Sequence, residues 1–276
     1  IFYWYIEIVY KDKIKYKFIE VDNFDGPGSS LGYSLLQVRD YITGPFIFHC
    51  NDSIIYEDID IENMNENTLF IYDDPLCSYQ YSSVNLKDNY VSKMNEKGEI
   101  DFDYVYIGVS YIKNFDLFFN YLNEFYVSNS KKTELSDIHV YKMFIKNNIN
   151  IIGKKIQKYC DIGNTNKYKE ASKVFKSNYY VLQKNDEAIS FVGNKVIKFF
   201  KDEKINKKRV ERTKHIPQSL IPKLFNSSNN YFSMELINGK VLSDHYNENL
   251  INNLLDFMFL NLWNKTYEDK NFKNNC

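Results

Sequence analysis

Two aspartates stand where short apolar segments end, in positions typical of sites that bind phosphates or metal ions. Asp52 follows the apolar run 45–50, and Asp161 marks a second change from strand to loop. A carboxylate at the end of a buried strand is how open α/β sheets build such sites. The pair of Asn51 and Asp52 is also ordinary turn chemistry, so position alone leaves both interpretations of Asp52 open.

Glycines mark two further places where the backbone could approach a ligand. Gly26 and Gly28 lie in a loop before a predicted helix at 31–38, with two serines that could cap it. Backbone N–H groups at such a helix start can contact a phosphate or a base, although a plain loop has the same composition. Gly108 lies inside a predicted strand, where glycine marks either a close approach by a ligand or a bulge.

The spacing of apolar residues predicts strands and helices that position these groups. Strands are predicted over residues 1–10, 14–21, 45–50, 68–72, 79–86, 90–94 and 103–111. Helices are predicted over residues 31–38, 115–125, 136–145 and 167–175. Short strands at 179–183, 188–192 and 195–200 then indicate an antiparallel meander, followed by a further strand at 231–237 and a helix over 250–263. The change of pattern predicts two domains, over residues 1–176 and 178–276.

The composition is that of a globular protein without a general affinity for polyanions. The 276 residues suffice for two modest domains or one large one, and 44% of them are hydrophobic. The 35 basic and 36 acidic side chains leave a net charge of -1. A basic stretch at 195–214 could form a nucleic-acid patch, but in a nearly neutral chain it is far more typical of a solvated helix that follows a strand. We therefore predict no nucleic-acid partner.

The cysteines and histidines argue against a zinc site and for a reducing compartment. The four cysteines are widely spaced without a CxxC pair, and the four histidines form no cluster in the sequence. We predict a cytoplasmic location and no membrane span, because no signal peptide or long apolar run is visible. The first residue is Ile1, which suggests that the chain was cut from a longer one.

Four segments of the first 176 residues carry a more specific signal through their order and spacing. They are Gly26-Pro27-Gly28-Ser29-Ser30, Pro45-Phe46 to Asn51-Asp52, Val91-Ser92-Lys93-Met94-Asn95-Glu96-Lys97, and Asp161-Ile162-Gly163-Asn164 with Tyr168. In this order they resemble the sugar-phosphate nucleotidyltransferase family, which makes an NDP-sugar and pyrophosphate from an NTP and a sugar 1-phosphate. The resemblance implies an α/β fold, a Rossmann-like mixed sheet of the GT-A type with helices on both faces.

The resemblance also implies roles for individual residues. Asp52 and Asp161 would hold Mg²⁺ and act in catalysis, and the substrates would lie against Gly26, Gly28, Asn51, Glu96, Lys97 and Gly108. Nucleotidyl transfer brings several negative charges together, so catalysis is mainly positioning and charge neutralisation. Mg²⁺ prefers oxygen ligands and keeps waters, so two carboxylates suffice.

The family's glycine-rich loop with a catalytic Arg, near the start of the fold, has no counterpart in this sequence. Because that loop binds the triphosphate, the resemblance implies that the 276-residue chain is inactive or poorly active in nucleotidyl transfer. Measurable NDP-sugar synthesis by this chain would overturn that expectation.

The last hundred residues contain segments that resemble the N-terminal lobe of the choline kinase and aminoglycoside phosphotransferase group. The strand 193–199 would carry the ATP-contacting Lys198, Glu211 on the next helix would pair with it, and Glu235 would lie in the hinge that holds the adenine. Lys198 and Glu211 could equally be solvated surface residues. The family's His-x-Asp motif is absent, because the chain stops first. The resemblance implies a small α+β kinase-like domain without kinase activity in this chain.

Together these observations predict an Mg²⁺-dependent nucleotidyltransferase of capsule or surface-glycan synthesis, fused to a kinase-like domain. A cytidylyltransferase for phosphocholine or a similar phosphorylated alcohol is the runner-up, because a choline kinase-like partner would supply that substrate. A catalytically silent binding or regulatory module is the third alternative. The sequence fixes neither the base, nor the sugar or alcohol, nor the oligomeric state.

Overall fold

The computed structural model describes residues 6–7, 9–10, 13–74, 80–128, 135–175, 184–239, 242, 245 and 247–263. The chain divides into two compact units. One unit is formed by residues 12–178, and the other by residues 1–11 together with 179–276. Each unit is described by itself.

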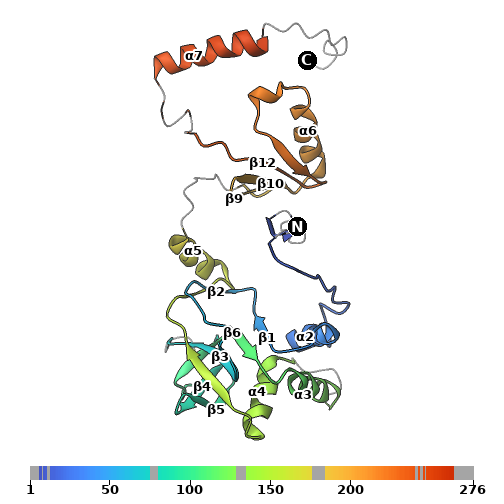
Figure 1. The fold of residues 1–276 in the computed structure, drawn as a ribbon, viewed down its shortest axis with the longest axis vertical. Helices are drawn as coiled ribbons and strands as arrows, with labels where there is room; N and C mark the ends of the chain where they lie inside the picture. Colours follow the sequence, from blue (N-terminus) through green and yellow to red (C-terminus); the bar gives the residue numbers. More distant parts are fainter. Residues whose placement is uncertain are drawn as a thin grey trace. The chain divides into compact units, whose positions relative to one another are not determined.

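The unit of residues 12–178 contains a mixed sheet and helices (Figure 1). Its helices are α2 (Leu31–Gln37), the 3₁₀ helix η1 (Arg39–Tyr41), α3 (Phe115–Ser128), α4 (Asp137–Lys146) and α5 (Thr165–Val174). Its strands are β1 (Phe46–His49), β2 (Ser53–Ile55), β3 (Asn67–Tyr72), β4 (Ser83–Lys87), β5 (Tyr90–Asn95), β6 (Tyr104–Ile112), β7 (Ile151–Lys155) and β8 (Tyr159–Asp161).

Six of these strands form one sheet in the order β1-β6-β3-β7-β5-β4. The β3–β7 pair is parallel, whereas β1 and β3 both run antiparallel to β6. Strands β2 and β8 form a separate antiparallel pair. The predicted mixed α/β architecture is thus present in this unit.

The two faces of the large sheet are covered differently. On one face, Phe118 and Phe119 of α3 and Tyr141 and Phe144 of α4 pack with buried sheet residues in one hydrophobic core. On the other face a smaller cluster centred on Phe70 packs against non-helical residues, among them residues of the segment 55–64. Helices on both faces were predicted, but in the described residues the helical core lies on one face.

The strand before Asp52 differs from its prediction as a fully buried strand. Strand β1 is at the edge of the sheet and pairs only with β6 among the described strands. Phe48 is buried, whereas Ile47 is 37% exposed and His49 is exposed, because successive residues point to opposite faces and only the face of Phe46 and Phe48 packs in the core.

The predicted strands at the start of the chain are wrong. The described residues Ile6, Glu7, Val9 and Tyr10 are helical, and residues 14–21 have no regular structure. Apolar residues of the second segment stay exposed, such as Ile14 at 51% and Phe18 at 40%. Among the described residues no strand pairs with this segment, so its β-propensity alone does not produce a strand.

The second unit contains a four-stranded antiparallel sheet in the order β11-β12-β10-β9. Its elements are β9 (Glu187–Val192), β10 (Lys195–Phe200), α6 (Glu203–Thr213), the 3₁₀ helix η2 (Gln218–Leu220), β11 (Leu224–Ser227), β12 (Tyr231–Glu235), α7 (Glu248–Met258) and the π-helical turn η4 (Phe259–Trp263). Buried Val196, Phe200 and Phe232 supply its core. The predicted meander is confirmed for β9 and β10, and the further strand predicted at 231–237 is present as β12. The strand predicted at 179–183 lies outside the described residues.

No helix in the described part of the chain combines the length and the apolar character that crossing a membrane requires.

Candidate functional site

Asp52 and Asp161 are brought together by the short ribbon of β2 and β8. Asp52 lies in the turn between β1 and β2, and Asp161 is the last residue of β8. Ser53 pairs with Asp161, and the N–H of Ile162 donates to the carbonyl of Asp52 at 2.8 Å. The turn predicted at the Asn51-Asp52 pair is therefore present, and it directs Asp52 toward Asp161.

Gly163 leaves open the space between the two carboxylates. A Cβ atom at this position would lie 3.1 Å from Oδ2 of Asp52 and 3.1 Å from Oδ1 of Asp161. The two oxygens are therefore no further apart than twice that distance. Within the described residues, the Asp52 carboxylate accepts no hydrogen bond.

This donor set fits Mg²⁺. Magnesium is usually held by one or two carboxylates, waters and substrate phosphates rather than by a complete protein cage. The described residues contain no cluster of three or more acidic, His or Cys side chains that could hold a metal alone. Two facing carboxylates with space between them match the first arrangement.

Asp161 is held by three donors. Its Oδ1 accepts the backbone N–H of Gly163 at 2.7 Å, and its Oδ2 accepts the ammonium of Lys167 at 2.8 Å and the hydroxyl of Tyr81. Burial alone would raise the pKa of Asp161, but the hydrogen bonds from Lys167, Tyr81 and Gly163 lower it below its ordinary value. Asp161 is therefore ionised and fixed in orientation.

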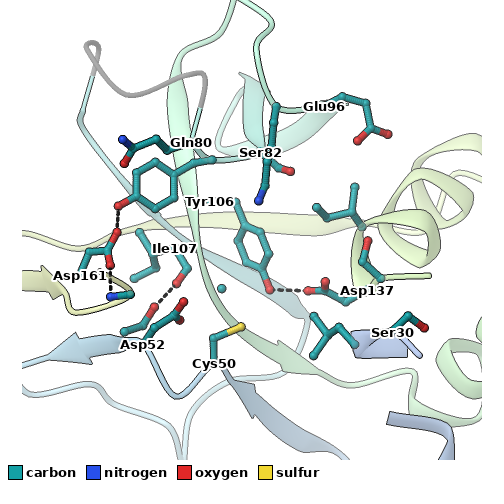
Figure 2. Close-up of a pocket in the computed structure, with 18 of the residues that line it drawn as sticks. Ser30, Cys50, Asp52, Gln80, Ser82, Glu96, Tyr106, Ile107, Asp137 and Asp161 are labelled. Atoms are coloured by element: carbon teal, nitrogen blue, oxygen red, sulfur yellow. Dashed lines mark hydrogen bonds between the residues drawn. The ribbon is translucent and has the colours of Figure 1, made fainter. Parts of the chain in front are cut away.

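Asp52, Tyr81, Asp161 and Gly163 line a cavity of about 980 Å³ (Figure 2). Of the residues predicted from the sequence, Asp52, Glu96, Lys97, Gly108 and Asp161 line it. Figure 2 shows Asp52 and Asp161 on one side and Asp137 and Ser30 on the other, with Tyr106 and Ile107 of β6 between them.

The glycine loop reaches the cavity through its serines. Ser29 and Ser30 line the wall, whereas Gly26, Gly28 and Asn51 are not among the described lining residues. Gly26 and Gly28 have φ angles of +81° and +88°, and Ser30 caps α2 by accepting the N–H of Tyr33. The glycines therefore shape the entry of the chain into α2.

Gly108 is required by the turn that follows β1. Its φ is +73°, and a Cβ there would lie 2.9 Å from Sγ of Cys50. The N–H of Cys50 donates to the carbonyl of Gly108 at 2.9 Å, and the Ser53 hydroxyl donates to the carbonyl of Ile107 at 2.6 Å. The close approach at this glycine is thus made by the chain itself, beside the cavity.

Glu96 and Lys97 lie in the turn after β5 and line the cavity. The Glu96 carboxylate forms an ion pair with Lys142 of α4. Both partners are exposed, so this pair contributes little to stability. The pair does hold the ammonium of Lys142 beside Glu96, which lines the cavity.

The far wall contains buried polar groups that were not predicted. The Tyr106 hydroxyl donates to Oδ2 of Asp137 at 2.7 Å, and the Asp137 side chain is buried. Burial raises the pKa of Asp137 above its ordinary value, although the hydrogen bond from Tyr106 opposes that rise. The buried hydroxyl of Ser82 also lines the cavity and has no hydrogen-bond partner among the described residues. A bound ligand could satisfy it.

In the second unit, the three predicted ATP-contacting residues do not meet in one cluster. Lys198 lies on β10, and its pKa is lowered by burial and by the nearby Arg209. The Glu211 carboxylate instead contacts Lys214 at 2.7 Å and His215 at 3.8 Å, the two residues that directly follow its own helix. The backbone N–H of Glu235 donates to the carbonyl of Lys223 at 2.8 Å within the sheet. Helix α6 turns Glu211 to solvent, which is why the expected pair with Lys198 does not form.

No protein-family model matches the sequence, and no curated protein matches it. The structure is similar to that of a chain assigned as a glucose-1-phosphate thymidylyltransferase from Bacillus anthracis, with 17% identity and a TM-score of 0.47 over 57% of this chain and 65% of that one. It is also similar to CTP:phosphocholine cytidylyltransferase from Streptococcus pneumoniae, with 16% identity and a TM-score of 0.47 over 56% and 67% of the two chains. A third similar structure is the inositol-1-phosphate CTP transferase from T. maritima, with 18% identity and a TM-score of 0.41 over 55% of this chain and 64% of that one. The chain thus spans about two thirds of the length of these nucleotidyltransferases.

Proposed function

We propose that the unit of residues 12–178 belongs to an Mg²⁺-dependent nucleotidyltransferase that couples an NTP to a phosphorylated small molecule. The acceptor is a sugar 1-phosphate, or a phosphorylated alcohol such as phosphocholine in the runner-up form. The whole protein would act in the cytoplasm in the synthesis of capsule or surface-glycan precursors. Its second unit would be a kinase-like domain that prepares the acceptor.

The observation that supports this proposal is the gathering of four distant segments around one cavity. Ser29 and Ser30, Asp52, Glu96 with Lys97, and Asp161 with Gly163 and Asn164 all line it. These are the segments through which the sequence resembles the nucleotidyltransferase family. Unrelated loops would have no reason to meet at a single cavity of about 980 Å³, which is large enough for a nucleotide.

We assign each residue of the cavity a role according to its charge. Asp52 and Asp161 would hold Mg²⁺, which when bound supplies neutralisation of the phosphate charges. Lys97 would attract the phosphate of the acceptor, and Glu96 would hold Lys142 close to the same edge. Ser30 and Ser82 provide hydroxyls for the uncharged parts of the substrates.

The direct test is product formation by the chain and by charge-neutral variants. The chain is incubated with Mg²⁺, each common NTP, and either glucose 1-phosphate or phosphocholine, and pyrophosphate and the diphosphate-linked product are followed by ³¹P NMR. Mg²⁺-dependent binding of each NTP is measured in parallel by calorimetry. Because the sequence has no counterpart of the family's glycine-rich loop, product formation by this chain is expected to be low, and Mg²⁺-dependent nucleotide binding is the main readout. We expect Asp52→Asn and Asp161→Asn each to weaken that binding by about tenfold or more, and to remove any product that the unmodified chain forms, because each variant removes a charge that would hold Mg²⁺.

Asp58→Asn is the matched control, since Asp58 is an exposed acidic residue just beyond β2 that does not line the cavity. It should behave as the unmodified chain. If the chain gives neither product nor Mg²⁺-dependent nucleotide binding, the proposal is wrong, and the silent module becomes the better account. The acceptor that yields product decides between the sugar and alcohol forms.

A further inference from the structure

A lysine already occupies one side of the carboxylate pair. The ammonium of Lys167, in the first turn of α5, lies 2.8 Å from Oδ2 of Asp161. The two side chains are only 20% and 16% exposed. An ion pair this far removed from solvent is weakly screened, unlike the exposed pair of Glu96 and Lys142.

The two oxygens of Asp161 face different partners. Oδ1 faces Gly163 and the space shared with Asp52, whereas Oδ2 receives Lys167 and the Tyr81 hydroxyl. Lys167 also lies over the ring of Tyr81, 4.4 Å from its centroid. A divalent cation between the carboxylates could therefore bind Oδ1 of Asp161 while the ammonium of Lys167 stays bound to Oδ2. The Asp161 carboxylate would then contact the metal ion and the ammonium group at the same time.

We infer that Lys167 is a specificity-determining residue that makes the site prefer a metal–triphosphate complex over a free divalent cation. This inference rests on the proposed function. Lys167 cancels one of the two carboxylate charges, so a free divalent cation meets less attraction and an added repulsion from the ammonium. A triphosphate that arrives with its metal reverses the sign, because Lys167 then attracts the phosphate oxygens.

The effect has opposite signs for two ligands, which makes it measurable. The probes are Mn²⁺ alone, as a substitute for Mg²⁺, and Mn²⁺ with inorganic tripolyphosphate, which removes the unknown base from the experiment. Affinities are measured by calorimetry and by the loss of the free Mn²⁺ signal in electron paramagnetic resonance. We expect Lys167→Met to bind free Mn²⁺ about tenfold more tightly and the Mn²⁺–tripolyphosphate complex about tenfold more weakly, since one charge–charge contact in a half-buried site is worth roughly that factor.

Two variants serve as controls. Lys167→Arg keeps the charge and should restore both affinities to near those of the unmodified chain. Lys169→Met removes an exposed lysine from the same helix and should change neither. Thermal unfolding of each variant shows whether the unit is folded.

If Lys167 only kept Asp161 in place, Lys167→Met would weaken the binding of both ligands, because a displaced Asp161 would bind neither of them. Weakening of both, or an unchanged affinity for free Mn²⁺, would therefore overturn the inference. Failure of the proposed function looks different, because the unmodified chain would then bind neither probe, or would bind Mn²⁺ equally well after Asp52→Asn.

Discussion

At the scale of single residues, the candidate site depends on Gly163 having no Cβ atom. The side chains of Asp52 and Asp161 face the position where a Cβ would be, and each would be 3.1 Å from it. That distance is shorter than ordinary van der Waals contact between carbon and oxygen. Because Gly163 has no side chain, the space between the two carboxylates stays open.

Replacing Gly163 by alanine should therefore impair cation binding more than folding. The φ angle at Gly163 is not in the left-handed region, so alanine can adopt the backbone, and the exposed site can relax. We expect Gly163→Ala to weaken Mn²⁺ binding by about tenfold while changing the free energy of unfolding by less than about 1 kcal/mol. Calorimetry and urea unfolding measure the two quantities.

Gly44→Ala is the control for this substitution, because a Cβ at Gly44 would contact nothing within 4 Å. It should leave Mn²⁺ binding unchanged. An unaltered affinity in Gly163→Ala would mean that cations do not bind between Asp52 and Asp161.

At the scale of elements, the cavity is held between β6 and the start of α4. Tyr106 of β6 donates to Asp137 in the first turn of α4, and Tyr141, one turn further on, forms a 2.6 Å hydrogen bond with Ser110 of β6. All four side chains are buried. This polar contact fixes helix against strand within an otherwise apolar core, at the cost of burying a carboxyl group.

The buried carboxyl of Asp137 should make stability depend on pH. Its pKa in the folded state is raised by burial, so folding favours the protonated form, and the chain loses stability as pH rises from the ordinary pKa through the raised one. Asp137→Asn cannot ionise and does not have this loss. We expect the unfolding free energy of the original chain, relative to Asp137→Asn, to fall by at most about 1.4 kcal/mol per pH unit over that window.

Urea unfolding of both proteins between pH 4 and pH 8 provides the measurement. Asp116→Asn removes an exposed carboxylate from the first turn of α3, where desolvation gives no reason for such a trend. If the difference in unfolding free energy between the original chain and Asp137→Asn stays constant with pH, ionisation of Asp137 does not destabilise the folded state.

The elements that sequence patterns predicted correctly are those whose signal is local. Ser30 caps α2, and β10 spans residues 195–200, as the serine and the alternating apolar residues indicate. Strand β7 was not predicted, because its sequence is short and ends in two lysines. Its place in the centre of the sheet comes from parallel pairing with β3, which is more than eighty residues earlier in the chain.

The same distinction applies to the site. Asp52 and Asp161 could be singled out because each stands at the end of an apolar segment. Lys167 could not, since in the sequence it is one of several lysines on a polar helix. Its contact with Asp161 depends on the course of the loop between β8 and α5, and the distant Tyr81 contacts both residues. Tyr106 and Asp137 were likewise hidden, because the sequence does not show that a carboxylate at a helix start faces a strand.

At the scale of the whole molecule, the chain consists of two units that have separate hydrophobic cores. Phe144 is fully buried in the core of residues 12–178, and Phe200 is 1% exposed in the four-stranded sheet of the second unit. Units with their own cores can unfold as separate cooperative units. The fold of the candidate site therefore depends on the first core and not on the second.

Substitutions in the two cores should accordingly act on different parts of the chain. Removing a buried phenylalanine costs about 3–5 kcal/mol through lost burial and the cavity left behind. We expect Phe144→Ala to accelerate hydrogen exchange in β3 and β6 while exchange in β9 and β10 stays unchanged, and Phe200→Ala to do the reverse. Hydrogen exchange followed by mass spectrometry reports both regions in one experiment. Acceleration in both units by either variant would mean that the two cores unfold together, and the proposal that the second unit is a separate domain would then be overturned.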